Sequence, residues 1–392
     1  MPWKMTFIVP AALLVLAAAV YGGVEKGVGD EWPVYHGDAA LRGVAAISLP
    51  EKPVELWRLK APAPVSLPPV VGGGKIYFVT DDGQAHAATL QGEKAWSARI
   101  PPAEGKAPGP GEESEKLTTP PLYARGLLLA GSGRGNLFAF DAASGKVKWK
   151  YTVGGSLLGS PNWMEPEGAR GARILAVSQA SGSVHCVELS GGKPAWVSKP
   201  TDRCDGSPGV GSNFVVFGNC ASELQVLDSG SGAKVAQIRF PERGPVAGGV
   251  AVKGSLAFAG TRDGTLVCAD AAKGRVVWTN HFGNGEAFAT PAVAGGKIVC
   301  ASNDGLVACL DKADGVKLWS FTCGDEPLSP AVAGDRVVVS AGGALYILNL
   351  SDGAKIWSGR PGDRISSPAV ADGRIYIGTD EGFIICYGQA KE

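Results

Sequence analysis

The side chains in this sequence that are equipped for chemistry are eight cysteines, four histidines and a scattered set of charged residues. The histidines, His36, His86, His185 and His281, lie far apart without the close spacing of metal ligands. We therefore expect each to be a strand-face residue that makes one hydrogen bond. No G-x-S-x-G, H-E-x-x-H or phosphate-binding-loop pattern is present. Nothing in the sequence supports a hydrolase or a nucleotide-binding protein.

The cysteines fall into two groups. Four of them occupy one position of an internal repeat, where other copies carry Ala, Val or Ile, so we expect them to pack in the core: Cys186, Cys268, Cys309 and Cys386. Cys204 and Cys220 lie at the ends of an expected hairpin, one residue out of register. For this pair a disulfide and two free thiols are both open. A bridge between Cys300 and Cys309 is a weaker alternative, and Cys323 has no evident partner.

Charged residues recur at the second turn of each repeat and at the start of its first strand. These positions should gather on one face of the folded protein, around its axis. Two interpretations stay open, a solvated rim of loops or a surface that binds a partner. The residues are Arg134, Arg203, Asp205, Arg262, Asp263, Asp304, Glu326, Arg364, Asp380 and Glu381.

The overall composition limits the partners. The 37 basic and 37 acidic side chains give a formal net charge of zero, so no global field draws the chain to nucleic acid or to anionic lipid. Gly occurs 57 times and Pro 27 times, which favours many tight turns between short strands.

Residues 1–23 have the pattern of an export signal, with an apolar run over 7–20 that follows a lysine. The run is short for a membrane-spanning helix of ~20 residues, so cleavage after Ala19 is favoured over retention as an anchor. No cysteine precedes Cys186, so we do not expect a lipid-modified cysteine. We expect a periplasmic or otherwise extracytoplasmic protein, anchored in the inner membrane only if the segment stays uncleaved.

The elements that must position these residues come from the repeat. Each copy has four short runs of apolar and β-branched residues separated by Gly, Asp and Ser, the pattern of a four-stranded antiparallel sheet. One such sheet cannot bury both faces, so the copies must pack face to face around a ring. The sequence therefore predicts an all-β fold, an eight-bladed β-propeller. The copies begin at 67–71, 118–123, 159–162, 206–210, 245–252, 289–293, 328–332 and 366–370.

Tryptophan ends the fourth run of most copies and is expected to dock one blade against the next. In "AFDAASGKVKW" the small Ala139 should face inward, Asp141 should bond to amides of the turn, and Gly145 should supply the turn's backbone conformation. The fourth copy carries Ala236 at the tryptophan position, so its contact with the next blade should be the weakest. The expected docking residues are Trp57, Trp96, Trp149, Trp196, Trp278, Trp319 and Trp357.

The last copy, ending in "FIICYGQAKE", lacks a fourth run, whereas "VELWRLK" at 54–60 is a tryptophan run with no copy before it. We expect the N-terminal run to complete the last blade, because closing the ring removes both open sheet edges. The blades then average about 42 residues, within the ~40–45 typical of four-stranded blades. The predicted organisation is a signal or anchor at 1–23, an entry segment at 24–50, the propeller at 51–388 and a tail at 389–392.

The tryptophan-ending run resembles the repeat of pyrroloquinoline-quinone-type propellers. Their docking pattern is A-x-D-x-x-x-G-x-x-x-W, and residues 139–149 match it at every specified position. Residues 31–45 are similar to the WPxxRGD entry segment of extracytoplasmic members, although His36 stands where Arg is commoner. The resemblance covers about residues 30–388. It implies relatives of two kinds: quinone-dependent alcohol and glucose dehydrogenases, and BamB, the scaffold subunit of the outer-membrane barrel-assembly machinery.

For a dehydrogenase the resemblance implies a bridged pair of adjacent cysteines, a tryptophan floor under the quinone, a calcium cluster of Glu, Asn and Asp, and long enclosing loops. This sequence has no Cys-Cys pair, and of the tryptophans that do not dock blades only Trp163 is expected near a channel. We therefore expect no catalytic residue, metal or cofactor, and predict a monomeric scaffold with protein partners in the cell envelope. The alternatives are a quinone-dependent dehydrogenase and a propeller that binds a small ligand or polysaccharide on its axial face.

Overall fold

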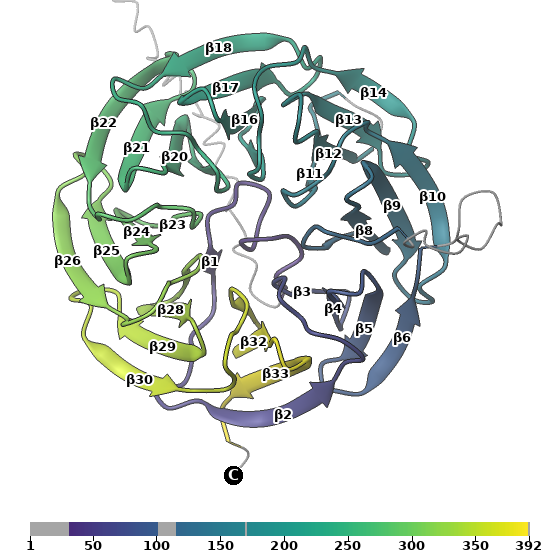
Figure 1. The fold of residues 1–392 in the computed structure, drawn as a ribbon, viewed down its shortest axis with the longest axis vertical. Helices are drawn as coiled ribbons and strands as arrows, with labels where there is room; N and C mark the ends of the chain where they lie inside the picture. The colour runs from purple at the N-terminus through teal and green to yellow at the C-terminus, as the bar shows by residue number, and fades with distance from the viewer. Residues whose placement is uncertain (1–30, 101–114, 169–170, 391–392) are drawn as a thin grey trace, which may run out of the picture.

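The computed structural model describes residues 31–100, 115–168 and 171–390. Its strands form eight sheets arranged as the blades of a ring (Figure 1), so the predicted eight-bladed propeller is confirmed. The expected signal segment at 1–23 lies outside the described residues. Within those residues, the structure contains no helix with the length and apolar character needed to span a membrane.

The first four blades are each built from the innermost strand outward. Blade one has β3 (Val70–Gly72), β4 (Lys75–Val79), β5 (Ala85–Thr89) and β6 (Lys94–Ala98); blade two has β7 (Leu122–Ala124), β8 (Leu127–Gly131), β9 (Asn136–Asp141) and β10 (Val147–Thr152). Blade three has β11 (Asn162–Met164), β12 (Arg173–Val177), β13 (Val184–Glu188) and β14 (Pro194–Val197); blade four has β15 (Gly209–Val210), β16 (Phe214–Asn219), β17 (Glu223–Asp228) and β18 (Lys234–Arg239).

The next three blades follow the same order. Blade five has β19 (Ala251–Lys253), β20 (Leu256–Gly260), β21 (Thr265–Asp270) and β22 (Arg275–His281); blade six has β23 (Ala292–Ala294), β24 (Lys297–Ser302), β25 (Leu306–Asp311) and β26 (Lys317–Thr322). Blade seven has β27 (Ala331–Ala333), β28 (Arg336–Ala341), β29 (Ala344–Asn349) and β30 (Lys355–Gly359), and a short strand, β1 (Val44–Ala45), pairs in parallel with β27.

Blade eight takes its outer strand from the other end of the chain. It has β31 (Ala369–Ala371), β32 (Arg374–Gly378) and β33 (Phe383–Gly388), and β2 (Val54–Lys60) pairs antiparallel with β33. Figure 1 shows purple β2 along the edge of yellow β33. The closure predicted from the unpaired tryptophan run is confirmed, and it leaves no open junction in the ring.

The burial of each strand follows from its place in the blade. The second and third strands lie between neighbouring blades and bury both faces, as in β20, where every residue after Leu256 is buried. Their sequences are therefore nearly continuous runs of small and apolar residues. Outer strands alternate between exposed and half-buried residues, as β22 does around Trp278. The core is divided into packets between adjacent blades, such as the one that holds Tyr77 and Phe140.

Six tryptophans join consecutive blades through one repeated contact. Each indole donates its Nε1–H to a carbonyl in the last turn of the next blade, at 3.0 to 3.1 Å: Trp57 to Leu90, Trp96 to Ala142, Trp149 to Leu189, Trp196 to Ser229, Trp278 to Lys312 and Trp319 to Leu350. A Cβ atom on Gly145 would lie 2.6 Å from the Trp96 ring, and the Gly145 φ is +72°. Glycine is therefore required in this turn by both packing and backbone conformation.

A β-bulge orients the side chain at the tryptophan position of each outer strand. In blade two Val147 pairs with Phe140 and Trp149 pairs with Ala139, so Lys148 is the extra residue. The same register shift occurs between the third and fourth strands of every blade. Because a bulge increases the local twist, it turns the following side chain toward the neighbouring blade.

Two blade junctions differ from this pattern. Ala236 takes the tryptophan position in blade four and lies against Gly274 of blade five, where an added Cβ would be 3.3 Å from the alanine Cβ. Trp357 faces blade eight, which has no turn between its third strand and β2. It packs instead edge-on to Tyr387, with the ring centroids 5.7 Å apart.

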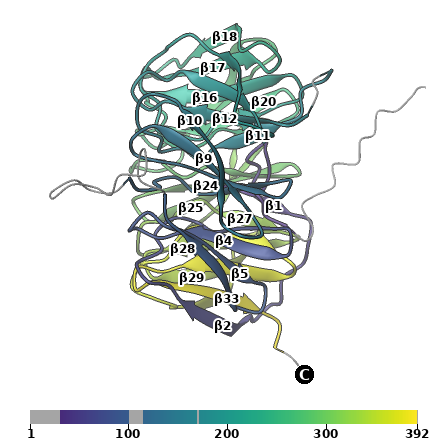
Figure 2. The same ribbon diagram turned by 90° about the vertical axis from the view of Figure 1, so that its right-hand side faces the viewer.

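The entry segment, residues 31–45, covers the free edges of the innermost strands. Trp32 pairs with Val71 of blade one through two backbone hydrogen bonds. Five further carbonyls accept amide hydrogen bonds at 2.7 to 2.9 Å: Pro33 from Tyr123, Ala39 from Val210, Ala40 from Val252, Arg42 from Val293 and Gly43 from Val332. Seen edge-on, β1 lies toward one face of the ring (Figure 2). The segment thus satisfies edges that would otherwise stay unpaired.

Candidate functional site

The axis of the ring holds a pocket of about 300 Å³ with a wall from every blade. Its lining includes Pro68, Pro120, Ser160, Ser207, Gly249, Ala289, Ser329 and Ser367, which all precede the first strand of their blades, and Tyr35 of the entry segment. In an antiparallel blade this end of the first strand lies beside the turn between the second and third strands. The axial funnel therefore opens on the face where the charged residues were predicted to gather.

Two side chains of the entry segment fill the axis below the funnel. The Tyr35 hydroxyl lies 2.9 Å from Thr290 Oγ1 and 2.7 Å from Ser329 Oγ, and burial raises its pKa. The His36 ring nitrogens lie 2.7 Å and 2.9 Å from the carbonyl oxygens of Leu41 and Pro330. Because burial lowers the pKa of His36, its neutral ring can donate to only one of these two acceptors.

Arg262 connects three segments at the mouth of the funnel. Its guanidinium nitrogens lie 3.8 Å from an Asp205 oxygen and 3.6 Å from a Glu286 oxygen, and its Cζ lies 4.9 Å from the centre of the Phe288 ring. Arg203 pairs with the same aspartate at 2.9 Å. The segments before blades four and six and the second turn of blade five are thus held together by charge and by a cation–π contact.

The ionisation of Asp205 follows from these neighbours. Burial acts to raise the pKa of its carboxyl group, but hydrogen bonds from Arg203 and Gln179 and the two arginine charges prevail, so the pKa is lowered. Asp205 is therefore a carboxylate at neutral pH and keeps the network charged.

The other residues of the predicted face are spread around the rim. Glu326 also lines the funnel and is exposed, and Arg134 is exposed at the second turn of blade two. The remaining acids bond to their own or adjoining turns: Asp263 to the Thr261 hydroxyl, Asp304 to the Ser302 hydroxyl and the Asn284 amide, Asp380 to the Arg364 amide, and Glu381 to the Asp363 amide. Most of these carboxylates therefore have a structural partner.

Three residues of the funnel mouth were not predicted from the sequence. Glu286 and Phe288 contact Arg262, and Leu158 lines the funnel with 41% of its surface exposed. All three lie in segments that lead into a first strand, where the sequence shows no regular pattern. The only signal for them in the sequence was an apolar residue, Leu158 or Phe288, in a short connection that contains glycine.

The eight cysteines all carry free thiols in the structure. Cys204 is buried and Cys220 half-buried, and the Cys220 amide donates a 2.8 Å hydrogen bond to the carbonyl of Arg203, the residue before Cys204. The pair therefore lies on neighbouring strand ends. Cys300 pairs with Ala308 and not with Cys309, because the turn between β24 and β25 has three residues.

The two sulfurs of Cys300 and Cys309 therefore lie on opposite sides of the sheet, in different core packets, and the alternative of a bridge between them is wrong. The four cysteines at the shared repeat position are buried, each in register with the residue at the tryptophan position: Cys186 with Trp196, Cys268 with Trp278, Cys309 with Trp319 and Cys386 with Trp57.

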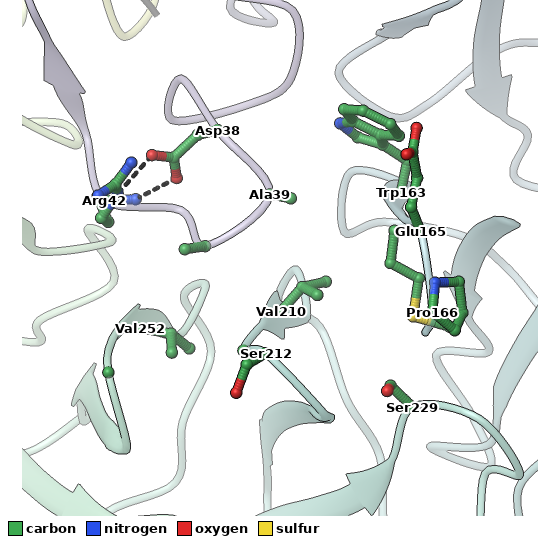
Figure 3. A pocket seen from close by; sticks show the side chains of 14 residues that line it. Asp38, Ala39, Arg42, Trp163, Glu165, Pro166, Val210, Ser212, Ser229 and Val252 are labelled. Carbon is green, nitrogen blue, oxygen red and sulfur yellow. Dashed lines mark hydrogen bonds and ion pairs between the residues drawn. The ribbon is translucent and has the colours of Figure 1, made fainter. Parts of the chain in front are cut away.

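A larger pocket of about 520 Å³ lies between the entry segment and blades three to five. It includes turns between first and second strands, so it opens on the face opposite the funnel mouth. Trp163 and Glu165 form one side and the Asp38–Arg42 ion pair stands across from them (Figure 3). The structure thus places Trp163 in this second pocket and not among the residues of the axial funnel.

The axial funnel is lined by side chains that differ from those the quinone-type resemblance implies. Its lining is mainly Ser, Gly, Pro and Leu, with Tyr35 and Phe288 as its aromatic residues and no tryptophan to support a quinone ring. In the part of the chain that the structure describes, no three His, Cys, Asp or Glu side chains are grouped as metal ligands. The residues that the quinone-type resemblance requires are not assembled on the axis.

Comparison with known proteins decides the family. The family model described as outer membrane protein assembly factor BamB matches residues 47–219 and again residues 220–392. The chain belongs to the BamB family. Escherichia coli K12 BamB is 30% identical over 202 residues, which are 50% of this chain and 46% of that protein. Bordetella pertussis BamB is 30% identical over 146 residues, 36% of each chain. The match therefore spans about half or less of these BamB relatives.

Solved structures share the propeller fold. BamB from Moraxella catarrhalis superposes with a TM-score of 0.68 at 17% identity, covering 87% of this chain and 98% of that one. Quinohemoprotein alcohol dehydrogenase from Comamonas testosteroni gives a TM-score of 0.75 at 13% identity, covering 93% and 82%. At such low identity both likenesses show the fold alone, so the choice between BamB-like scaffold and dehydrogenase rests on the site residues.

Proposed function

We propose that this protein is a non-catalytic scaffold of the cell envelope that holds a protein partner at its funnel mouth during the assembly of outer-membrane proteins. Membership of the BamB family and the names of its curated relatives support the assembly role. The same relatives support an extracytoplasmic location, which agrees with the export signal expected at 1–23. No site residue supports the dehydrogenase alternative.

The observation that carries the proposal is the environment of Arg262. Its guanidinium is bound to two carboxylates and stacked on Phe288, and Leu158 and Glu326 are exposed around the same funnel. Arginine and aromatic side chains surrounded by a polar rim are typical of the energetic centre of protein interfaces. The network also fixes the arginine before a partner binds, which lowers the ordering cost of association.

The test is affinity capture of the tagged protein from crosslinked cell envelopes. Arg262→Glu should reduce the recovery of outer-membrane assembly components at least tenfold, because it places a negative charge between Asp205 and Glu286. Arg275→Glu is the matched control, since Arg275 is exposed on outer strand β22 of the same blade. This control makes the same change of charge away from the funnel.

Equal capture by wild type and Arg262→Glu would remove the funnel mouth from the interaction. Absence of assembly components from the wild-type capture would contradict the scaffold itself. Quinone- and calcium-dependent dye reduction by the pure protein would favour the dehydrogenase instead.

A further inference from the structure

The 520 Å³ pocket occurs where the repeat departs from its own pattern. Three first strands carry Ala-Val after a proline, as in Ala292–Ala294, and blade three carries Asn162 and Trp163 instead. A large aromatic residue is not needed to pair these short strands. In blade three this position therefore adds a large aromatic side chain to the lining of the pocket.

Asn162 makes the contact between blade three and the entry segment. Its side-chain oxygen accepts the Trp163 amide at 2.7 Å, and its side-chain nitrogen donates at 2.8 Å to the carbonyl of Ala39. In blades two, four, five, six and seven a backbone amide contacts the entry segment directly. At blade three the Asn162 side chain makes this contact instead, and the pocket lies between Ala39 and Trp163 (Figure 3).

The charges around the pocket are balanced in pairs. Asp38 Oδ2 lies 2.6 Å from Arg42 Nε, with both side chains largely buried. Glu165 forms an ion pair with Arg125 of blade two. An anionic or a cationic ligand would have to break one of these pairs, and an acyl chain would leave Asp38 and Arg42 without water. The pocket therefore suits a neutral ligand with both an apolar face and hydrogen-bonding groups.

We infer that this pocket binds a neutral oligosaccharide. One face of a pyranose ring carries C–H groups that suit the electron-rich face of Trp163, while its hydroxyl groups can bond to the charged pairs and to Ser212 and Ser229, which also line the pocket. The volume lies within the range of about 300–1,000 Å³ usual for small-molecule sites. The pocket is on the face opposite the funnel, so this inference does not depend on the proposed scaffold role.

The experiment is a calorimetric titration of the purified full chain with N-acetylglucosamine trimer and, separately, with maltotriose. We expect at least one of the two sugars to bind. Trp163→Ala should then weaken that binding at least tenfold, and Ser212→Arg, a change at an exposed turn residue on the pocket rim, should weaken it similarly without altering the core. Glu167→Ala is the control in the connection that follows β11 and should bind as wild type, because Glu167 is exposed and lies outside the lining.

Thermal melting of each variant separates loss of fold from loss of binding, and Ser212→Arg keeps the test decisive if Trp163→Ala melts early. Binding of neither sugar to wild type, or unchanged binding by Ser212→Arg, would overturn the inference. Arg262→Glu should leave sugar binding unchanged. Loss of partner capture in Ser212→Arg, without sugar binding in wild type, would show instead that the pocket is a protein contact.

Discussion

The indole Nε1–H of Trp57 donates a 3.0 Å hydrogen bond to the carbonyl oxygen of Leu90. Trp57 lies in β2 of blade eight, and Leu90 lies in the last turn of blade one. This bond connects the first and last blades with the geometry that connects blades elsewhere in the ring. The ring thus closes through the same tryptophan–carbonyl hydrogen bond that joins the other blades, and β2 supplies the tryptophan.

Removing this contact should destabilise the whole ring. Trp57→Ala should lower the free energy of unfolding by about 3 kcal/mol, the low end for truncating a large aromatic residue, because Trp57 is half-buried. Deletion of residues 51–60 should cost more, since it also exposes the edge of β33. Urea unfolding followed by circular dichroism measures both, and an unchanged midpoint for the deletion would contradict the closure.

The docking tryptophans should differ in how much they contribute to the free energy of unfolding. Trp196 is buried and bonds to Ser229 of the next blade, whereas Trp357 is half-buried and has no such turn to contact. Trp196→Ala should therefore cost about 3–5 kcal/mol of unfolding free energy, and Trp357→Ala, the same substitution, clearly less. Equal losses in the two variants would show that the turn contact contributes little.

Alkaline pH should weaken the fold through the buried thiols. Burial raises the pKa of Cys268 from 9.0 to about 12, and Cys186 and Cys386 are raised similarly. Above pH 9 the unfolded chain releases these protons first, so stability is complete below pH 9 and falls as the pH rises toward 12. Cys268→Ala, which places the residue that blades one and two already carry there, should make the decline of the urea midpoint between pH 8 and 10 shallower. The same slope as wild type would contradict this assignment.

We propose that Cys204 and Cys220 form a disulfide under oxidising conditions. Incubation with oxidised glutathione should join their Sγ atoms, with two protons and two electrons passing to the glutathione disulfide to give two glutathione thiols. Burial raises the pKa of Cys204 to about 12 and also raises that of Cys220, so the reaction should accelerate as the pH rises. Peptide mass mapping after alkylation detects the bridge. Full alkylation of both cysteines after oxidation would count against it, and Cys220→Ser is the control.

The internal repeat was sufficient to predict the blades, because strand alternation, turn glycines and the tryptophan position are all encoded within about 40 consecutive residues. It also predicted the ring closure, since the unpaired run at 54–60 fits the only incomplete blade. The bridge between Cys300 and Cys309 was misjudged by one residue, because a two-residue and a three-residue turn look alike in sequence and only the register separates them.

By itself, then, the sequence determined the eight blades, the outer-strand tryptophans and the missing strand of blade eight. Only the tertiary structure decided which side chains meet near the axis. Arg262 meets Asp205 and Glu286, and Asn162 meets Ala39, across separations of 24 to 123 residues. Those meetings depend on how the ring curves and on the path of the entry segment, which no local pattern of residues encodes.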